Sequence, residues 1–178
     1  MKKILYSWLL AIAVCSCSQN TPVGPRPQVA SEFVTGIEED YGKYYDSVAH
    51  QVAALDLYSE GLTLDSLQRY QGSGTNLYIS DIFLKDSLLE VGAYRSDTTL
   101  EAFTFLPGKN FEGNPTGIYV VQVEKGKAFA VTVYTEGTME VKQVHDSTDI
   151  TFHFPLQSAQ KKEYTAHFRG ILQHKERK

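Results

Sequence analysis

The apolar residues of this chain recur at every second position, and this period constrains its fold more than any other feature. Successive side chains of a β-strand point to opposite faces, so a period of two predicts strands that bury one face. Five runs have this pattern: residues 53–58 (AALDLY), 100–105 (LEAFTF), 118–123 (IYVVQV), 128–134 (AFAVTVY) and 150–154 (ITFHF). Two further candidate strands are residues 77–84 and 89–94. No long run has the 3.6-residue period of an amphipathic helix.

We therefore expect an all-β domain. Short strands separated by Gly, Asp, Asn and Ser predict an antiparallel β-sandwich of about eight or nine strands, with a β-barrel as the alternative. Within 77–84 the alternation fails around Asp81, which predicts a β-bulge. Residues 34–45 are ambiguous. Their acidic cluster is compatible with the start of a helix, whereas Gly36, Gly42 and three tyrosines favour an extended segment.

The last two predicted strands can be aligned by their side chains. Pairing Phe152 with Phe168 gathers the apolar side chains of both strands on one face and the polar ones on the other. In this register His153 lies opposite His167. A slip of one residue would place a histidine opposite an aromatic ring and mix the two faces.

The N-terminal segment has the pattern of a secretory signal peptide. Lys2 and Lys3 precede an apolar stretch, residues 4–14, that only Ser7 interrupts. Eleven helical residues span about 16 Å at about 1.5 Å each, roughly half of a bilayer core, which is too short for a stable transmembrane helix. We therefore assign residues 1–16 to a signal peptide that is removed on export.

The residues at the end of this segment resemble the lipobox of bacterial lipoproteins. In Val14-Cys15-Ser16-Cys17 the small Ser16 precedes Cys17, whereas the bulky Val14 precedes Cys15. The resemblance implies cleavage before Cys17 and attachment of acyl chains such as palmitate to that cysteine. Several acyl chains anchor a protein stably, since one alone holds only marginally.

Beyond the lipidated cysteine the composition changes from a tether to a folded domain. Residues 17–31 contain Pro22, Pro25 and Pro27 and few apolar side chains, so we expect an extended tether. Residues 32–173 form the single all-β domain, and residues 174–178 form a basic tail. Without the signal peptide the chain keeps only Cys17, so no disulfide is expected.

The charge balance excludes one class of partner. Loss of Lys2 and Lys3 leaves 15 basic and 21 acidic residues, a net charge of −6. A mildly acidic surface attracts phosphate backbones poorly, so we expect no nucleic-acid partner.

Residues 107–117 (PGKNFEGNPTG) are the best candidate binding loop. The segment holds Asn110, Phe111, Glu112 and Asn114, which combine amide and carboxylate groups with an aromatic ring. Such a set can hydrogen-bond and stack a sugar, and its oxygen atoms can ligate Ca²⁺. The alternative is a structured connection between two strands.

The chain contains little that points to a metal, a cofactor or catalysis. His153 and His167 are weak metal candidates, because no third ligand lies near them in the sequence and an exposed polar pair is the simpler interpretation. Ser66 is followed by no lysine at the SxxK offset, and Gly72-Ser73-Gly74 lacks the spacing of a GxSxG elbow. The sequence leaves open whether carboxylates converge in space as a pair for glycoside hydrolysis. The candidates are Asp56, Glu60, Asp81 and Glu136. We therefore expect a protein that is not an enzyme and binds no cofactor.

The strand patterns resemble those of small β-sandwich lipoproteins from Bacteroidota. Residues 137–141 (GTMEV), 150–154 (ITFHF) and 164–172 (YTAHFRGIL) are similar to their closing strands, and residues 55–62 (LDLYSEGL) and 91–94 (VGAY) to earlier ones. The likeness covers about residues 40–172 and implies architecture and an envelope location, with no activity attached. In that phylum an acidic cluster after the lipidated cysteine is associated with surface export. Residues 18–21 (SQNT) contain no acid, which favours a periplasm-facing position at the outer membrane.

Together these features predict a lipid-anchored protein of the cell envelope that acts as a non-catalytic binding or assembly module. Its partners would be the membrane and either an envelope protein complex or a glycan. A carbohydrate-binding accessory lipoprotein is the first alternative, and a hydrolase is the second.

Overall fold

In the described part of the chain, every regular secondary-structure element is a β-strand. The computed structural model describes residues 28–46, 48–86, 88–155 and 163–177. The strands are β1 (Gln28–Asp40), β2 (Gln51–Ser59), β3 (Leu62–Leu64), β4 (Tyr70–Gly72), β5 (Gly74–Leu84), β6 (Gly92–Ser96), β7 (Thr104–Phe105), β8 (Lys109–Phe111), β9 (Asn114–Thr116), β10 (Ile118–Glu124), β11 (Lys127–Tyr134), β12 (Thr138–Val144), β13 (Ser147–Phe154), β14 (Glu163–Gly170) and β15 (Leu172–Glu176). The expected all-β class is confirmed. The fifteen strands in the described residues exceed the eight or nine expected, mainly because the sequence patterns do not reveal the short hairpins.

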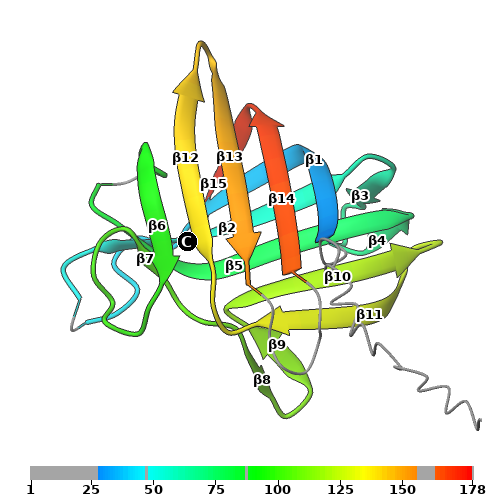
Figure 1. Ribbon diagram of the computed structural model, residues 1–178, viewed down its shortest axis with the longest axis horizontal. Helices are drawn as coiled ribbons and strands as arrows, with labels where there is room; N and C mark the ends of the chain where they lie inside the picture. The colour runs from blue at the N-terminus through cyan, green and yellow to red at the C-terminus, as the bar shows by residue number, and fades with distance from the viewer. Residues whose placement is uncertain (1–27, 47, 87, 156–162, 178) are drawn as a thin grey trace, which may run out of the picture.

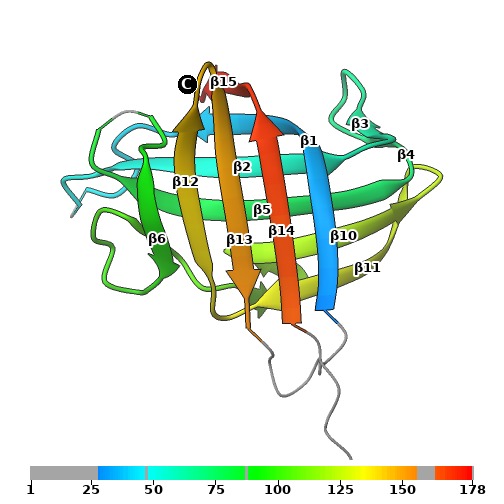
Figure 2. The same ribbon diagram turned by 45° about the horizontal axis from the view of Figure 1, so that its top comes forward.

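The main sheet forms two layers whose strands cross (Figures 1 and 2). The back layer has the order β11-β10-β5-β2-β1, and the front layer has the order β1-β14-β13-β12-β6. At the far edge β7 pairs with β6 and also with β5, so eight strands close into a barrel. This closure fits the barrel alternative, and the sandwich is not confirmed. The sheet is also mixed, because β14 and β15 run parallel to β1.

Strand β1 belongs to both layers and turns the corner between them (Figure 2). Its first part pairs with β14 as far as Phe33, and its second part pairs with β15 from Gly36 onward. A Cβ atom at Gly36 would lie 2.6 Å from a methyl carbon of Leu172 and 2.9 Å from one of Leu57. A glycine is needed here because those side chains pack directly against its backbone. The extended interpretation of residues 34–45 is thus confirmed as far as Asp40, where β1 ends.

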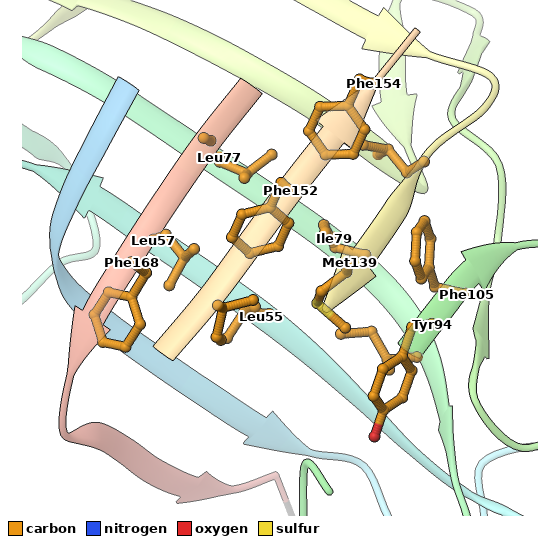
Figure 3. Close-up of a cluster of buried hydrophobic side chains, with 14 of the residues drawn as sticks. Leu55, Leu57, Leu77, Ile79, Tyr94, Phe105, Met139, Phe152, Phe154 and Phe168 are labelled. Carbon is orange, nitrogen blue, oxygen red and sulfur yellow. The ribbon is translucent and has the colours of Figure 1, made fainter. Parts of the chain in front are cut away.

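The core fills the space between the two layers (Figure 3). Its largest buried side chains come from the inward faces of both layers, including Leu55, Leu57, Leu77, Ile79, Tyr94, Phe105, Met139, Phe152, Phe154 and Phe168. The alternation read from the sequence therefore identifies the inward face of most long strands. Each such side chain contributes about 1.5–3 kcal/mol when fully buried.

Two of the predicted strands differ from the structure. Only Thr104 and Phe105 of residues 100–105 are in a strand, because Leu100 and Phe103 adopt left-handed backbone conformations, with φ of 60° and 63°. Residues 89–94 contribute a strand only from Gly92 onward. The bulge expected around Asp81 is confirmed, since Asp81 has a φ of 52° and the pairing of β5 with β2 shifts beside it.

The predicted register of the last strand pair is wrong by two residues. Phe168 pairs with Ile150, and His167 pairs with Thr151, so His153 lies opposite Thr165 and the two histidines do not face each other. The faces are nevertheless correct, because a shift of two residues returns every side chain to its original side. Apolar patterning alone cannot distinguish two such registers.

The domain boundaries also move. Residues 28–31, assigned to the tether, belong to β1, and residues 174–176 of the predicted basic tail belong to β15. The signal peptide, Cys17 and the remainder of the tether lie outside the described residues. Among the residues described, no helix is long and apolar enough to cross a bilayer.

Candidate functional site

The outward side chains of the front layer line up in two rows across its strands. One row runs through Ala93, Glu140, Thr151, His167 and Glu32, each opposite the next on the neighbouring strand. The second row runs through Arg95, Thr138, His153 and Thr165. We call these two rows the cross-strand face. The side chains between them along each strand point into the core.

A cleft of about 560 Å³ opens at the β6 end of the cross-strand face. It lies between β6, residues 101–104 and strands β12 and β13. The half-buried ring of Phe103 lines it and packs against Tyr94, with their ring centroids 5.1 Å apart. A Cβ atom at Gly92 would come within 2.9 Å of the Phe103 ring. Glycine at this position therefore lets the ring lie against the strand.

The backbone that carries Phe103 is fixed in a strained conformation. The Phe103 amide donates to the Phe83 carbonyl at 2.9 Å, and the Thr104 hydroxyl donates to the Glu101 carbonyl at 2.6 Å. The Asp97 carboxylate accepts from two successive backbone amides at the start of the same loop. A left-handed conformation at a bulky residue costs about 1–3 kcal/mol and persists only where its surroundings determine it. Such strain concentrates at functional sites.

Polar contacts at the rim restrain side chains of the cleft. Glu140 pairs with Lys142 at 2.9 Å, and Arg95 pairs with Asp97 at 3.3 Å. His153 lies 3.1 Å from Glu163. These pairs are exposed and contribute little to stability, about 0–1 kcal/mol each, but they restrain the polar groups around the opening.

A second depression of about 230 Å³ lies beside the cleft, where Thr151 lines both. Its histidine, His167, contacts two carboxylates: Nδ1 lies 2.9 Å from Glu32 and Nε2 lies 3.2 Å from Asp149. Burial lowers the pKa of His167, but the hydrogen bonds to these acids outweigh it, so the pKa lies above its ordinary value. With both ring nitrogens engaged, His167 has no lone pair to activate a nucleophile or to bind a metal.

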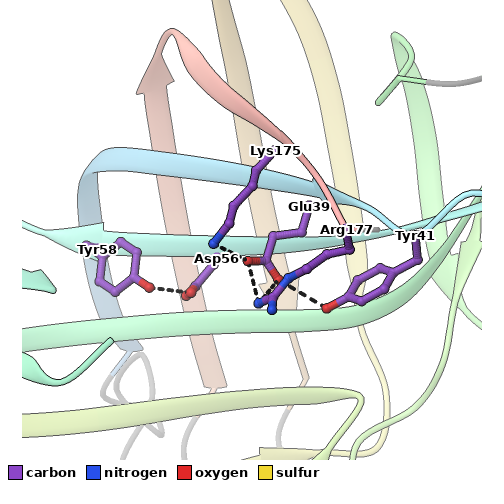
Figure 4. A network of polar contacts seen from close by, with 6 residues as sticks. All are labelled: Glu39, Tyr41, Asp56, Tyr58, Lys175 and Arg177. Carbon is purple, nitrogen blue, oxygen red and sulfur yellow. Dashed lines mark hydrogen bonds and ion pairs between the residues drawn. The ribbon is translucent and has the colours of Figure 1, made fainter. Parts of the chain in front are cut away.

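The outer face of the back layer carries a polar cluster (Figure 4), and a depression of about 490 Å³ lies between the β3–β4 hairpin and β15. Glu39, whose side chain is 7% exposed, accepts from Arg177 at 2.7 and 2.9 Å and from Tyr41 at 3.1 Å. Lys175 adds a contact at 3.5 Å. Burial alone raises the pKa of Glu39, but the hydrogen bonds from Arg177 and Tyr41 outweigh it and the pKa lies below its ordinary value. This cluster ties the C-terminal strand to the sheet.

A second acid of the same face is joined to tyrosines. Asp56 accepts hydrogen bonds from Tyr58 and Asn76, and Asn76 accepts one from Tyr70 at 2.8 Å. Burial raises the pKa of Asp56 despite these bonds. The β3–β4 hairpin covers this end of the face, and its Leu62 packs with Tyr58 in a separate apolar cluster.

The four acids considered for a hydrolytic site are not brought together. Asp56 has the partners just described on the back layer, whereas Asp81 accepts from Tyr45 at the bulge, at 2.7 Å. Glu60 is exposed in the turn that follows β2, and Glu136 is exposed in the connection between β11 and β12. Among the described residues no group of three or more His, Cys, Asp or Glu is placed to hold a metal ion.

The predicted binding loop, residues 107–117, contains the small hairpin β8–β9. Asn110 pairs with Pro115 and Phe111 with Asn114, and Glu112 lies in the turn. All four candidate side chains are exposed, with Phe111 at 67%, and none lines the cleft or the second depression. This arrangement fits the structured connection that was the alternative.

The residues of the cleft were mostly missed from the sequence. His153 was singled out, but for a different reason. A signal did exist, because Thr151 and His153 are the polar positions of the alternating run 150–154, and Thr138 and Glu140 alternate in the same way with Met139 and Val141. Comparison with known proteins finds no matching family model, curated protein or solved structure.

Proposed function

We propose that this protein is a lipid-anchored, non-catalytic binding module of the cell envelope, and that its ligand occupies the cleft beside Phe103. The anchor is the acylated Cys17 at the outer membrane, with the domain facing the periplasm. The apolar signal peptide, the lipobox and the resemblance to Bacteroidota lipoproteins support this location. An envelope complex or an envelope glycan is the expected source of the ligand.

The observation that carries the proposal is the cleft itself. Ligand sites are concave, have volumes of about 300–1,000 Å³, and combine an apolar surface with a few fixed polar groups. The cleft has about 560 Å³, a half-buried aromatic ring and paired charged groups at its rim. The engagement of both nitrogens of His167 by carboxylates supports binding in preference to nucleophilic catalysis.

The proposal is tested by filling the cleft. Ala93 is an exposed alanine that lines it, and Ala128 on β11 is an exposed alanine that does not. Full-length lipoprotein, captured through its acyl chains on a lipid-coated sensor, is exposed to solubilised envelope fractions. We expect Ala93→Trp to lose most of the binding response and Ala128→Trp to keep it.

Equal responses from the two variants would show that the cleft is not the site. The anchor is tested separately, by acyl labelling of the precursor. Cys17→Ser should abolish the label, and labelling that persists would exclude Cys17.

A further inference from the structure

The cleft and the second depression belong to one continuous surface. They share Thr151, and the row from Ala93 to Glu32 connects them across five neighbouring strands. Strands in a sheet lie about 4.8 Å apart, so this row is about 19 Å long. A compact ligand in the cleft would leave the far end of the row, at His167 and Glu32, unused.

The groups along the rows favour hydrogen bonding over ionic attraction. They include three threonines, Thr138, Thr151 and Thr165, together with carboxylate, imidazole and guanidinium groups. The charged ones already have partners of opposite charge: Glu140 has Lys142, Arg95 has Asp97, and His167 has Glu32 and Asp149. The His153 ring lies 3.1 Å from Glu163. A charged ligand would have to compete with these pairs, whereas a neutral ligand can bond to them as they stand.

The aromatic ring of Phe103 lies at one end of this surface. Phe103 lines the cleft, is half-buried and is supported from behind by Tyr94. The apolar face of a sugar ring stacks on such a surface, while its hydroxyl groups bond to planar polar side chains around it. The spacing of neighbouring strands is close to the length of one hexose in an extended chain.

Resting on the proposed function, we infer that the ligand is a neutral oligosaccharide that lies along the row from Ala93 to Glu32. One sugar stacks on Phe103 in the cleft. The following units cross β12, β13 and β14, with about one sugar for each strand, and the last one reaches His167 and Glu32. The binding site is therefore an extended one, and its affinity depends on the length of the oligosaccharide.

The test is a titration of the full lipoprotein, in detergent micelles, with ladders of neutral gluco-, manno-, galacto- and xylo-oligosaccharides from one to six units. For at least one ladder we expect affinity to rise about tenfold between the disaccharide and the pentasaccharide, and then to level off. The reason is that each added unit meets a further strand until the row ends.

Variants at the two ends separate the steps of this inference. His167→Gln and Glu32→Gln should each weaken pentasaccharide binding about fivefold, the loss expected for one hydrogen bond, and leave the disaccharide unchanged. Ala93→Trp should abolish binding of both, and Ala128→Trp should change neither.

Two results would overturn the inference without touching the proposed function. The site would be restricted to the cleft if affinity did not depend on the length of the sugar. The same would follow if His167→Gln and Glu32→Gln weakened the binding of short and long sugars alike. If Ala93→Trp removes binding of envelope material but no ladder binds, the ligand is not a neutral oligosaccharide.

Discussion

The two layers of the barrel have similar inward faces and very different outward ones. The outward face of the front layer is open, and its ion pairs are about half exposed, such as Glu140 with Lys142 at 55% and 57%. The outward face of the back layer is partly covered by the β3–β4 hairpin and by side chains of β15, and the side chain of its Glu39 is 7% exposed. Similar residue types therefore do different things on the two layers. Acids and bases stabilise the fold where they are covered and remain available to a ligand where they are open.

This difference depends on segments that are distant in the sequence. Arg177 reaches Glu39 from the other end of the domain, and β15 lies beside β1 only because the chain returns after β14. We expect substitutions on the back layer to reduce stability and substitutions on the cross-strand face to reduce binding. The following variants test that division.

The largest effect is expected for a glycine of the covering hairpin. Gly72 has a φ of 86°, and a Cβ atom there would lie 2.0 Å from the Gly61 carbonyl oxygen. Gly113 lies in the hairpin β8–β9, which projects from the barrel. It has a φ of 85° and nothing within 4 Å of its Cβ position. Gly113→Ala should cost about 1 kcal/mol from backbone strain alone, and Gly72→Ala about 3–4 kcal/mol because overpacking adds to it.

Urea unfolding of both variants measures this difference. Equal losses of unfolding free energy would mean that the β3–β4 hairpin contributes no more than an isolated turn, and the comparison between covered and open faces would fail on the back layer.

The next effect concerns matched basic residues on the two layers. Arg177→Ala leaves the buried Glu39 carboxylate with Tyr41 and a distant Lys175, and should lower the free energy of unfolding by about 2 kcal/mol. Lys142→Ala removes the partner of the exposed Glu140 and should change it by less than about 0.5 kcal/mol.

Thermal and urea unfolding give both values, and adding Glu39→Gln to Arg177→Ala should recover part of the loss because no charge is then left buried. A loss from Lys142→Ala as large as that from Arg177→Ala would contradict the assignment of the front layer as an open surface.

Much of the fold could be predicted because burial follows alternation. The runs at 53–58 and 150–154 became strands whose inward residues are those expected. Residues 100–105 alternate equally well but form only a two-residue strand, because the backbone turns at Leu100 and Phe103. Alternation reports which side chains are apolar and carries no information about a backbone that tertiary contacts force into an unusual conformation.

The candidate site was harder to predict than the fold for a related reason. Residues 107–117 contain the residue types that bind ligands, yet they form a projecting hairpin that lines neither depression. The cleft joins residues from β6, the following loop, β12 and β13, and only the sheet order brings these together. A site made from several strands depends on register, and the predicted register of His153 and His167 was displaced by two residues.

The smallest expected effect is a dependence on pH that belongs to the front layer. His167 has a raised pKa because Glu32 and Asp149 stabilise its charged form. Its contribution to stability is therefore complete below the unfolded pKa of about 6.5 and is lost as the pH rises through the folded pKa. Because the side chain is 35% exposed, the loss should be below about 1 kcal/mol. The measurement is the unfolding free energy of the natural protein minus that of His167→Gln, at pH 5.5 and at pH 8.5. We expect this difference to shrink at the higher pH. A difference that stays constant or grows would mean that the carboxylates do not hold His167 in its charged form, and that its nitrogens are free after all.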